Sequence, residues 1–375
     1  MARIERILIA GGGIAGLTAA IALRKRGFAP ELVEQSESWR ALGAGIVIQP
    51  NAMRLLRSLG IGRAIEVAGA SPRQFKFLDR EGELLCEIDL IDLWSSVGSG
   101  VAVDRGALQK ALVRAADGAH CRLGVKVTGL RPCEDLVAVD FSDGESRDYD
   151  LVIGADGIGS TVRALAVSKA QPKYCGQTAW RAVAQLKASV SDEIQFWLGE
   201  GCFFTTYSVG ERTYGCGYIA ELNPSREPIE GRVASLRKRF ASFGRPIRAF
   251  LEALERDDQI HCSPIEELEL PEWRNGRVLL IGDAAHASSP LMGQSGCMAI
   301  EDAVVLAELL QSCESLDAAL DAYVRRRRPR VDWVQAQSEA LGRSALLPAA
   351  MRDSVLRQHG AQQFRDRYAP LLSAP

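Results

Sequence analysis

The sequence predicts an α/β fold: a parallel β-sheet with flanking helices, interrupted by an inserted mixed or antiparallel β-sheet and followed by a C-terminal helical tail. Three observations predict this arrangement. An apolar run that ends in glycines leads into a helical pattern at Ile4–Arg26. Segments that alternate between polar and apolar residues fill the chain from Tyr174 to about His261. A strand pattern followed by Gly-Asp returns at Val278–Asp283, so we expect the chain to leave the first sheet and then rejoin it.

The N-terminal elements predict a βαβ unit. Ile4–Ala10 is an apolar strand, and Ile14–Arg26 is a helix with cations in its last turn and a glycine behind it. Glu31–Glu34 is the second strand of the unit. The next expected helices are Asn51–Leu59 and Asp104–Ala116.

The remaining elements follow in order. Shorter alternating segments with turn signals occupy residues 72–90 and 122–149, and Leu151–Gly154 is a third buried strand. The insertion holds four strand patterns, namely Trp180–Leu186, Gln195–Leu198, Cys202–Ser208 and Thr213–Ile219. Two helices are expected near Gly231–Phe243 and Ile247–Arg256, and the chain reads as helical from Val304. Within this tail, Leu341–Arg357 predicts an amphipathic helix that packs on its own domain, contacts a membrane or forms a dimer.

Composition and charge exclude several classes of protein. The 375 residues are 47% hydrophobic and 25% charged, which is ordinary for a globular protein. A formal net charge of −2 argues against nucleic acid as the main partner. No apolar run is long enough to span a membrane, and no signal peptide fits before the first strand. The nine cysteines are scattered without a CxxC pair and the four histidines lack ligand spacing, so we expect reduced thiols, no metal site and a cytoplasmic protein.

The stretch GGGIAG has the GxGxxG pattern between a strand and a helix, where it binds the pyrophosphate of a dinucleotide. Gly11 permits the tight turn, Gly13 lets the backbone approach the pyrophosphate, and Gly16 lets the helix pack on the sheet. The helix N-terminus adds free N–H groups and a partial positive charge. Glu34 follows at the roughly 20-residue distance at which a carboxylate accepts hydrogen bonds from an adenosine ribose. NAD and FAD both contain this adenosine diphosphate.

A second glycine-rich segment, Gly282–Gly296, distinguishes between NAD and FAD as the ligand. Asp283 follows a strand of the same sheet, where it cannot serve the first phosphate site but suits a sugar alcohol further along the ligand. FAD has such a ribityl chain and NAD does not. Past Pro290, a glycine-rich turn opens a helix whose N-terminus can face the flavin N1–C2=O edge, which becomes anionic when the flavin is reduced.

Three motifs, in order and at the family spacing, resemble those of the single-component FAD-dependent aromatic hydroxylases (the p-hydroxybenzoate hydroxylase-like, group A flavoprotein monooxygenases). They are GGGIAG with Glu34, GADGIGSTVR at Gly154–Arg163, and GDAAHASSPLMGQSG at Gly282–Gly296. Smaller resemblances are Arg40 with GAGI, Asp104-Arg105, YCGQTAWR at Tyr174–Arg181, and Tyr323–Arg330. The resemblance implies that FAD is contacted by Gly11, Gly13, Ala15, Gly16, Glu34, Arg40, Gly45, Arg105, Asp156, Gly282, Asp283, Pro290, Gly293 and Gly296.

The resemblance also implies a domain division. A discontinuous, Rossmann-like FAD-binding domain of the glutathione reductase type would comprise residues 1–70, 100–170 and 275–345. A substrate-binding β-sheet domain would comprise residues 71–99 and 171–274, and a helical tail residues 346–375. Three positions depart from the family pattern: Ser295 replaces a glycine in the flavin loop, Gln35 a common basic residue, and Ser208 a common proline. We expect Ser295 to restrict the backbone near the flavin.

The chemistry implied by the resemblance is that of an NAD(P)H-consuming monooxygenase. NADH or NADPH binds transiently and reduces the bound FAD, which reacts with O2 to give a C4a-hydroperoxide that hydroxylates a small aromatic or N-heteroaromatic substrate. The cofactor carries the reaction, and the protein positions the substrate and excludes water. The alternatives are a flavin-dependent oxidase or dehydrogenase on the same fold, and a non-catalytic flavin-binding partner protein. We expect a monomer or a homodimer.

The substrate residues are expected on the inserted sheet, where alternate side chains face the flavin. The candidates are Trp180, Arg181, Phe204, Tyr207, Arg212 and Tyr214. The two arginines suit a carboxylate or phenolate, and the two tyrosines suit a hydroxyl group. His286 lies within a cofactor motif, which favours a structural role over that of a catalytic base. Arg325–Arg328, near an expected helix end, predict a solvated face or one that complements the helix dipole, in preference to a nucleic-acid contact.

Overall fold

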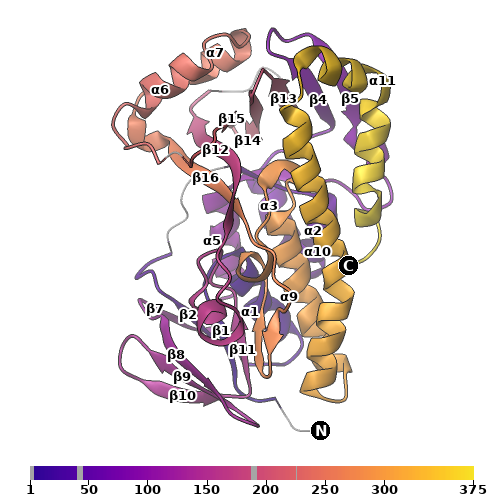
Figure 1. Ribbon diagram of the computed structural model, residues 1–375. Helices are drawn as coiled ribbons and strands as arrows, with labels where there is room; N and C mark the ends of the chain where they lie inside the picture. The colour runs from indigo at the N-terminus through magenta and orange to yellow at the C-terminus, as the bar shows by residue number, and fades with distance from the viewer. Residues whose placement is uncertain (1–3, 40–44, 187–191, 225) are drawn as a thin grey trace.

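The computed structural model describes residues 4–39, 45–186, 192–224 and 226–375, and it confirms the predicted α/β fold with helices at the C-terminal end (Figure 1). Two large sheets form the body of the molecule, and the long helix α10 (Leu316–Ala345) runs beside both of them (Figure 1). Within the described ranges, no helix has the length and apolar character that a membrane crossing requires.

The first sheet is parallel except at one edge. Its strands follow the order β17 (Arg274–Asn275), β18 (Val278–Leu280), β11 (Leu151–Gly154), β1 (Ile7–Ala10), β2 (Glu31–Glu34) and β7 (His120–Leu123). The edge strand β17 runs antiparallel to β18, whereas the other pairs are parallel. Strands β1, β11 and β18 are buried along their whole length, as their apolar runs predict for a sheet covered on both faces. Helix α1 (Ile14–Lys25) packs against both α9 (Ser295–Ser312) and α5 (Arg105–Ala115).

The second sheet combines the insertion with an earlier hairpin. Its strands follow the order β16 (His261–Glu267), β12 (Lys173–Ala184), β15 (Arg212–Ala220), β14 (Cys202–Val209), β13 (Glu193–Leu198), β4 (Gln74–Asp79) and β5 (Leu84–Asp89). The pair β4–β13 is parallel and the other pairs are antiparallel. Helices α6 (Arg232–Arg239) and α7 (Arg245–Glu252) cover one face with a separate apolar core. The opposite face of the sheet is not covered by α6 and α7, and it forms one wall of the cavity described below.

The smaller elements connect these two sheets. The helices are α2 (Pro50–Ser58), α3 (Gly62–Ala68), α4 (Leu90–Leu93), η1 (Arg163–Val167), η2 (Asp257–Gln259), α8 (Asp283–His286), η3 (Pro290–Met292) and η4 (Ala369–Leu371). A two-stranded sheet pairs β3 (Gly45–Ile48) with β6 (Val101–Asp104). A meander of β8 (Val127–Pro132), β9 (Val137–Phe141) and β10 (Ser146–Tyr149) completes the fold.

The structure corrects the prediction of one helix over Leu341–Arg357. Helix α10 ends at Ala345, and a new helix, α11 (Ala349–Tyr368), begins after Pro348. A proline disfavours helical backbone at the residue before it, so the chain turns there. Helix α11 then packs against β5, at the edge of the second sheet (Figure 1).

The expected solvated face at Arg325–Arg328 is also wrong in part. These residues lie in the middle of α10, which continues through Pro329, and not near a helix end. The side chain of Arg327 is fully buried, because two acidic side chains of α9 pair with it. Arg328 lies over the ring of Trp273, with its guanidinium carbon 4.6 Å from the ring centroid.

Candidate functional site

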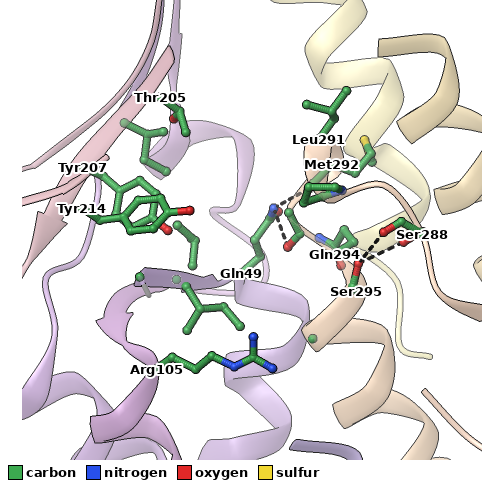
Figure 2. A pocket seen from close by; sticks show the side chains of 18 of the residues that line it. Gln49, Arg105, Thr205, Tyr207, Tyr214, Ser288, Leu291, Met292, Gln294 and Ser295 are labelled. Atoms are coloured by element: carbon green, nitrogen blue, oxygen red, sulfur yellow. Dashed lines mark hydrogen bonds between the residues drawn. The ribbon is translucent and has the colours of Figure 1, made fainter. Parts of the chain in front are cut away.

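A cavity of about 1180 Å³ lies between the carboxyl ends of the first sheet's strands and the inner face of the second sheet. Its lining includes the turn after β1, the turn after β11 and the loop from Ser288 to Gly296. Figure 2 shows Tyr207 and Tyr214 of the second sheet on one side and this loop on the other, with Arg105 below. The volume exceeds the roughly 300–1,000 Å³ of most small-ligand sites, so it suits a long ligand together with a second, smaller molecule.

The glycine turn after β1 fits a diphosphate. Gly11 has φ of +108°, and a Cβ there would overlap the carbonyl oxygen of Ala155. A Cβ at Gly16 would overlap the carbonyl oxygen of Gly11, so the first turn of α1 depends on this glycine. Gly13, by contrast, lines the cavity and would place a Cβ in open space. No described side chain caps α1 at Gly13, which leaves the first N–H groups of the helix available to an anion.

Glu34 is held at the same turn. Its Oε2 accepts a hydrogen bond from the Gly12 N–H at 2.7 Å, and its Oε1 accepts one from the Ser36 N–H at 2.8 Å. These bonds fix the carboxylate at the end of β2 while leaving further lone pairs on both oxygens. Glu34 is not among the residues that line the cavity, so the predicted ribose contact stays a prediction.

Asp283 stands at the start of α8, after Gly282, whose φ is +60°. Asp283 is exposed because it faces the open space of the cavity, and the protein walls enclose that space. This enclosure raises the pKa of Asp283, while the nearby His286 and Arg105 act in the opposite direction. A hydroxyl donor in the cavity would therefore stabilise the ionised carboxylate, which is the role predicted for a ribityl chain.

The loop before α9 adopts its shape without strain at Ser295. Among the described residues, every positive φ belongs to a glycine, so Ser295 has an ordinary helical backbone as the first residue of α9. Its hydroxyl lies 3.1 Å from the Ser288 hydroxyl and donates to the Ser288 carbonyl oxygen at 3.3 Å (Figure 2). Serine is therefore compatible with this position, where its hydroxyl links the two ends of the loop. No described side chain caps the N-terminus of α9, which also opens onto the cavity.

A buried ionic cluster supports this loop from behind. Arg327 donates to Glu301 at 2.6 Å and to Asp302 at 2.8 Å, and all three side chains are fully buried. Asp302 also accepts from the Gly282 N–H at 2.9 Å and contacts His286 Nε2 at 2.6 Å. Burial favours the neutral acid, but His286 and Arg327 outweigh it and hold the pKa of Asp302 well below its usual range. His286 is absent from the cavity lining, as its predicted structural role requires.

The wall of the cavity that the second sheet forms carries three polar residues, namely Arg181, His261 and Ser263. Arg181 on β12 faces the cavity and donates to the Ser263 hydroxyl on β16 at 2.8 Å. His261, which pairs with Arg181 in the register of these strands, lines the same space. Burial lowers the pKa of His261, and the charges of Arg181 and two further arginines lower it more. The imidazole is therefore neutral at pH 7 and able to accept a proton.

Three tyrosines form the wall above this group. The rings of Tyr207 and Tyr214 lie 4.6 Å apart between centroids (Figure 2). Tyr218 lies nearby and lines the cavity as well. Burial raises the pKa of all three phenols well above the usual value, so they remain neutral hydrogen-bonding groups.

The structure brings many of the predicted residues to this cavity. Those that line it are Gly13, Ala15, Gly45, Arg105, Arg181, Tyr207, Tyr214, Asp283, Pro290, Gly293 and Gly296. Gly11, Gly16 and Gly282 shape the adjoining backbone instead. Arg40 lies outside the described residues. Asp156 is not in the lining, since its carboxylate accepts from the N–H groups of Thr161 and Val162 and closes its own turn.

Three predicted substrate residues point elsewhere. Arg212 pairs with Asp104 at 3.1 Å and does not line the cavity. Trp180 and Phe204 belong to the separate core beneath α6 and α7. Neighbouring residues on a strand face opposite sides, so Arg181 in the cavity requires Trp180 to face away.

Sequence reasoning missed several lining residues, namely Gln49, Thr205, His261, Ser263, Phe364 and Tyr368. The alternation along β16 places His261 and Ser263 on one face, which is a usable signal. Phe364 and Tyr368 come from α11, and no local pattern indicates that this helix reaches the cavity.

Comparisons with known proteins agree with this geometry. A family model described as "FAD binding domain" matches residues 5–338. The chain is 34% identical over 340 residues to "Aurachin C monooxygenase/isomerase" of Stigmatella aurantiaca, covering 90% of this chain and 88% of the relative. It is 31% identical over 344 residues to "2-heptyl-3-hydroxy-4(1H)-quinolone synthase" of Pseudomonas aeruginosa, covering 90% and 88%. A crystal structure of a Klebsiella pneumoniae protein with FAD and uric acid superposes with a TM-score of 0.92 at 27% identity, covering 99% and 97%.

Proposed function

Because the chain belongs to the FAD binding domain family and is an FAD-dependent monooxygenase of the aromatic hydroxylase type, we propose that it hydroxylates a flat, nitrogen-containing aromatic ring. The reductant would be NADH or NADPH, and the oxygen would come from O2. A similar structure holds uric acid and a relative is named for a quinolone, and both of these compounds are N-heterocycles. The observation that carries the proposal is the group Arg181, His261 and Ser263 in the cavity wall.

The residues present fit FAD. The N-terminus of α1 at Gly13 would hold the diphosphate, Glu34 the ribose and Asp283 the ribityl chain, and the N-terminus of α9 would face the pyrimidine edge of the flavin. When bound, FAD supplies the electron transfer and oxygen transfer that amino-acid side chains cannot perform. Arg105 and Gly45 are proposed as further contacts, because both line the same cavity.

The second sheet would position the ring. Arg181 is a permanent cation and would hold a carbonyl, hydroxyl or carboxylate oxygen of the substrate. Neutral His261 would accept the proton of a ring N–H or O–H group, which makes the ring richer in electrons and a better target for oxygen transfer. Tyr207 and Tyr214 would bound the ring and exclude water.

The test measures NADH and NADPH oxidation by the FAD-loaded protein with a panel of N-heterocyclic and carbocyclic aromatic compounds. We expect N-heterocycles to accelerate the oxidation and to yield a product that is heavier by one oxygen atom. Strong stimulation by carbocyclic phenols alone, or nucleotide oxidation that yields only hydrogen peroxide with every ring, contradicts the proposal.

We further propose the domain division set out above, with residues 71–99 and 171–274 as the substrate-binding part. The parallel pairing of β4 with β13 supports the inclusion of the earlier hairpin. A cytoplasmic location is proposed because all nine cysteines are free thiols. The protein is expected to act as a monomer or a homodimer.

A further inference from the structure

A smaller apolar cavity of about 110 Å³, here called the branch, adjoins the main cavity between strands β4 and β13 and helices α10 and α11. Phe75, Phe196, Leu291, Phe364 and Tyr368 line both spaces, so the branch and the cavity meet at these side chains. The ring centroids of Phe75 and Phe364 are 5.0 Å apart, and those of Phe75 and Phe196 are 6.3 Å apart. No described residue of the glycine turn after β1 lines the branch, which therefore extends the substrate side of the cavity.

The two arginines that line the branch are already engaged by the protein. Arg352 donates to the carbonyl oxygen of Gly199 at 2.6 Å and to its neighbour Asp353 at 2.8 Å. Arg367 donates to Gln337 at 3.1 Å. A charged or polar ligand would lose its hydrogen bonds to water in the branch without gaining these side chains as partners. An aliphatic chain has no such hydrogen bonds to lose.

The outer end of the branch opens on an apolar surface. Leu347, in the turn between α10 and α11, and Val355, on α11, line the branch and are 40% and 38% exposed. Leu346 and Met351 beside them are 44% and 59% exposed. The outer end of the branch is therefore flanked by exposed apolar side chains.

We propose that this branch binds an aliphatic side chain carried by the ring substrate. The inference rests on the proposed function, because the ring must lie in the main cavity for its substituent to enter the branch. A cavity of about 150 Å³ lined by apolar side chains can hold benzene, so about 110 Å³ suits a short alkyl chain. Burial of each methylene group should lower the dissociation constant about fourfold until the branch is full.

The experiment uses the FAD-loaded, full-length protein and 4(1H)-quinolones whose 2-substituent is hydrogen, methyl, propyl, pentyl or heptyl. Binding is measured by the change in flavin absorbance and by calorimetry, and NADH and NADPH oxidation is measured in parallel. We expect the dissociation constant to fall with chain length and then level off.

Two variants change the branch and one serves as a matched control. Val355→Asp places a charge at the outer end, and Ala345→Phe fills the interior. Both should abolish the dependence on chain length and leave the binding of the unsubstituted ring unchanged. Met351→Asp adds the same charge one helical turn earlier, outside the branch lining, and should keep the dependence.

Several outcomes overturn the inference: equal binding of the unsubstituted and heptyl compounds, no binding of the heptyl compound, or unchanged chain-length dependence in both branch variants. Hydroxylation without chain-length dependence removes the branch proposal and leaves the proposed function standing. Chain-length-dependent binding without stimulated nucleotide oxidation supports the branch and removes the proposed function.

Discussion

His286 and Asp302 are joined by a contact of 2.6 Å between Nε2 and Oδ2, in a buried cluster behind the turn that presents Asp283. The same oxygen of Asp302 accepts from the Gly282 N–H, so one carboxylate ties the end of the first sheet to helix α9. Arg327 supplies the opposing charge from α10. Three segments between residues 282 and 327 therefore meet behind one wall of the cavity.

Asp302→Asn should destabilise the protein by about 3–5 kcal/mol, because it leaves Arg327 buried and incompletely paired. Chemical denaturation of the FAD-loaded protein measures this loss. The control is Glu308→Gln, which breaks the exposed pair with Arg326 and should cost at most about 1 kcal/mol. Equal losses in the free energy of unfolding would show that the buried cluster stabilises the protein no more than the exposed ion pair does.

The lowered pKa of Asp302 also predicts a pH dependence. A carboxyl group with a depressed folded pKa stabilises the protein above its unfolded pKa of about 3.9, and this contribution falls as the pH drops below that value. The free energy of unfolding should therefore decrease more steeply on acidification in the wild type than in Asp302→Asn. If the free energy of unfolding falls equally with pH in the wild type and in Asp302→Asn, the lowered pKa of Asp302 is contradicted.

Gly13→Ala and Gly16→Ala should fail in different ways. Gly13 has φ of −79° and open space around a Cβ, so alanine should fold normally but project a methyl group into the diphosphate site. We expect FAD affinity to fall at least about tenfold with an unchanged melting temperature of the apoprotein. Gly16→Ala should lower that temperature itself, because its Cβ overlaps backbone. A lower melting temperature of the Gly13→Ala apoprotein would contradict the open space around a Cβ at this position.

Arg181→Met should raise KM for the preferred ring about 10- to 100-fold, the loss expected for one or two hydrogen bonds to a charged group, while FAD content stays the same. Arg212→Met is the matched control on the same sheet, since that guanidinium points at Asp104. Steady-state kinetics and flavin absorbance measure the two effects. An equal rise in KM for both variants would place the substrate elsewhere.

His261 should set the acidic limb of the pH profile. The neutral imidazole is the base, and its pKa lies below the usual value of about 6.5 because of burial and neighbouring arginines. The acidic limb of kcat/KM should therefore have its midpoint below pH 6.5, where His261 becomes protonated. His261→Gln should lower kcat/KM and remove this limb, and an unchanged limb in that variant would assign it to another group.

Much of the cofactor site was predictable because its determinants are local. The roles of Gly11, Gly13 and Gly16 follow from steric limits on a turn between a strand and a helix, which depend on a few consecutive residues. The strand Glu31–Glu34 was predicted with the bounds that the structure shows. Asp156 shows the limit of this reasoning, since its motif was visible but its hydrogen bonds to its own turn were not.

The substrate side was less predictable. Strand alternation indicated that Arg181 and Trp180 face opposite sides, but not which side encloses the cavity. The break at Pro348 was not recognised, and with it the return of α11 to the cavity. Arg327 looked solvated because its partners Glu301 and Asp302 lie on a different helix.

The sequence by itself determined the fold class, the family and the position of the glycine turns, because motifs, short-range sterics and strand or helix periodicity encode them. The tertiary structure decided which side chains of β12, β14, β15, β16 and α11 meet, and so decided the second wall of the cavity and the apolar space beside it. The physical reason is that these contacts depend on how two sheets and a distant helix pack together. Packing is set by the fit of whole surfaces and not by any single stretch of the chain.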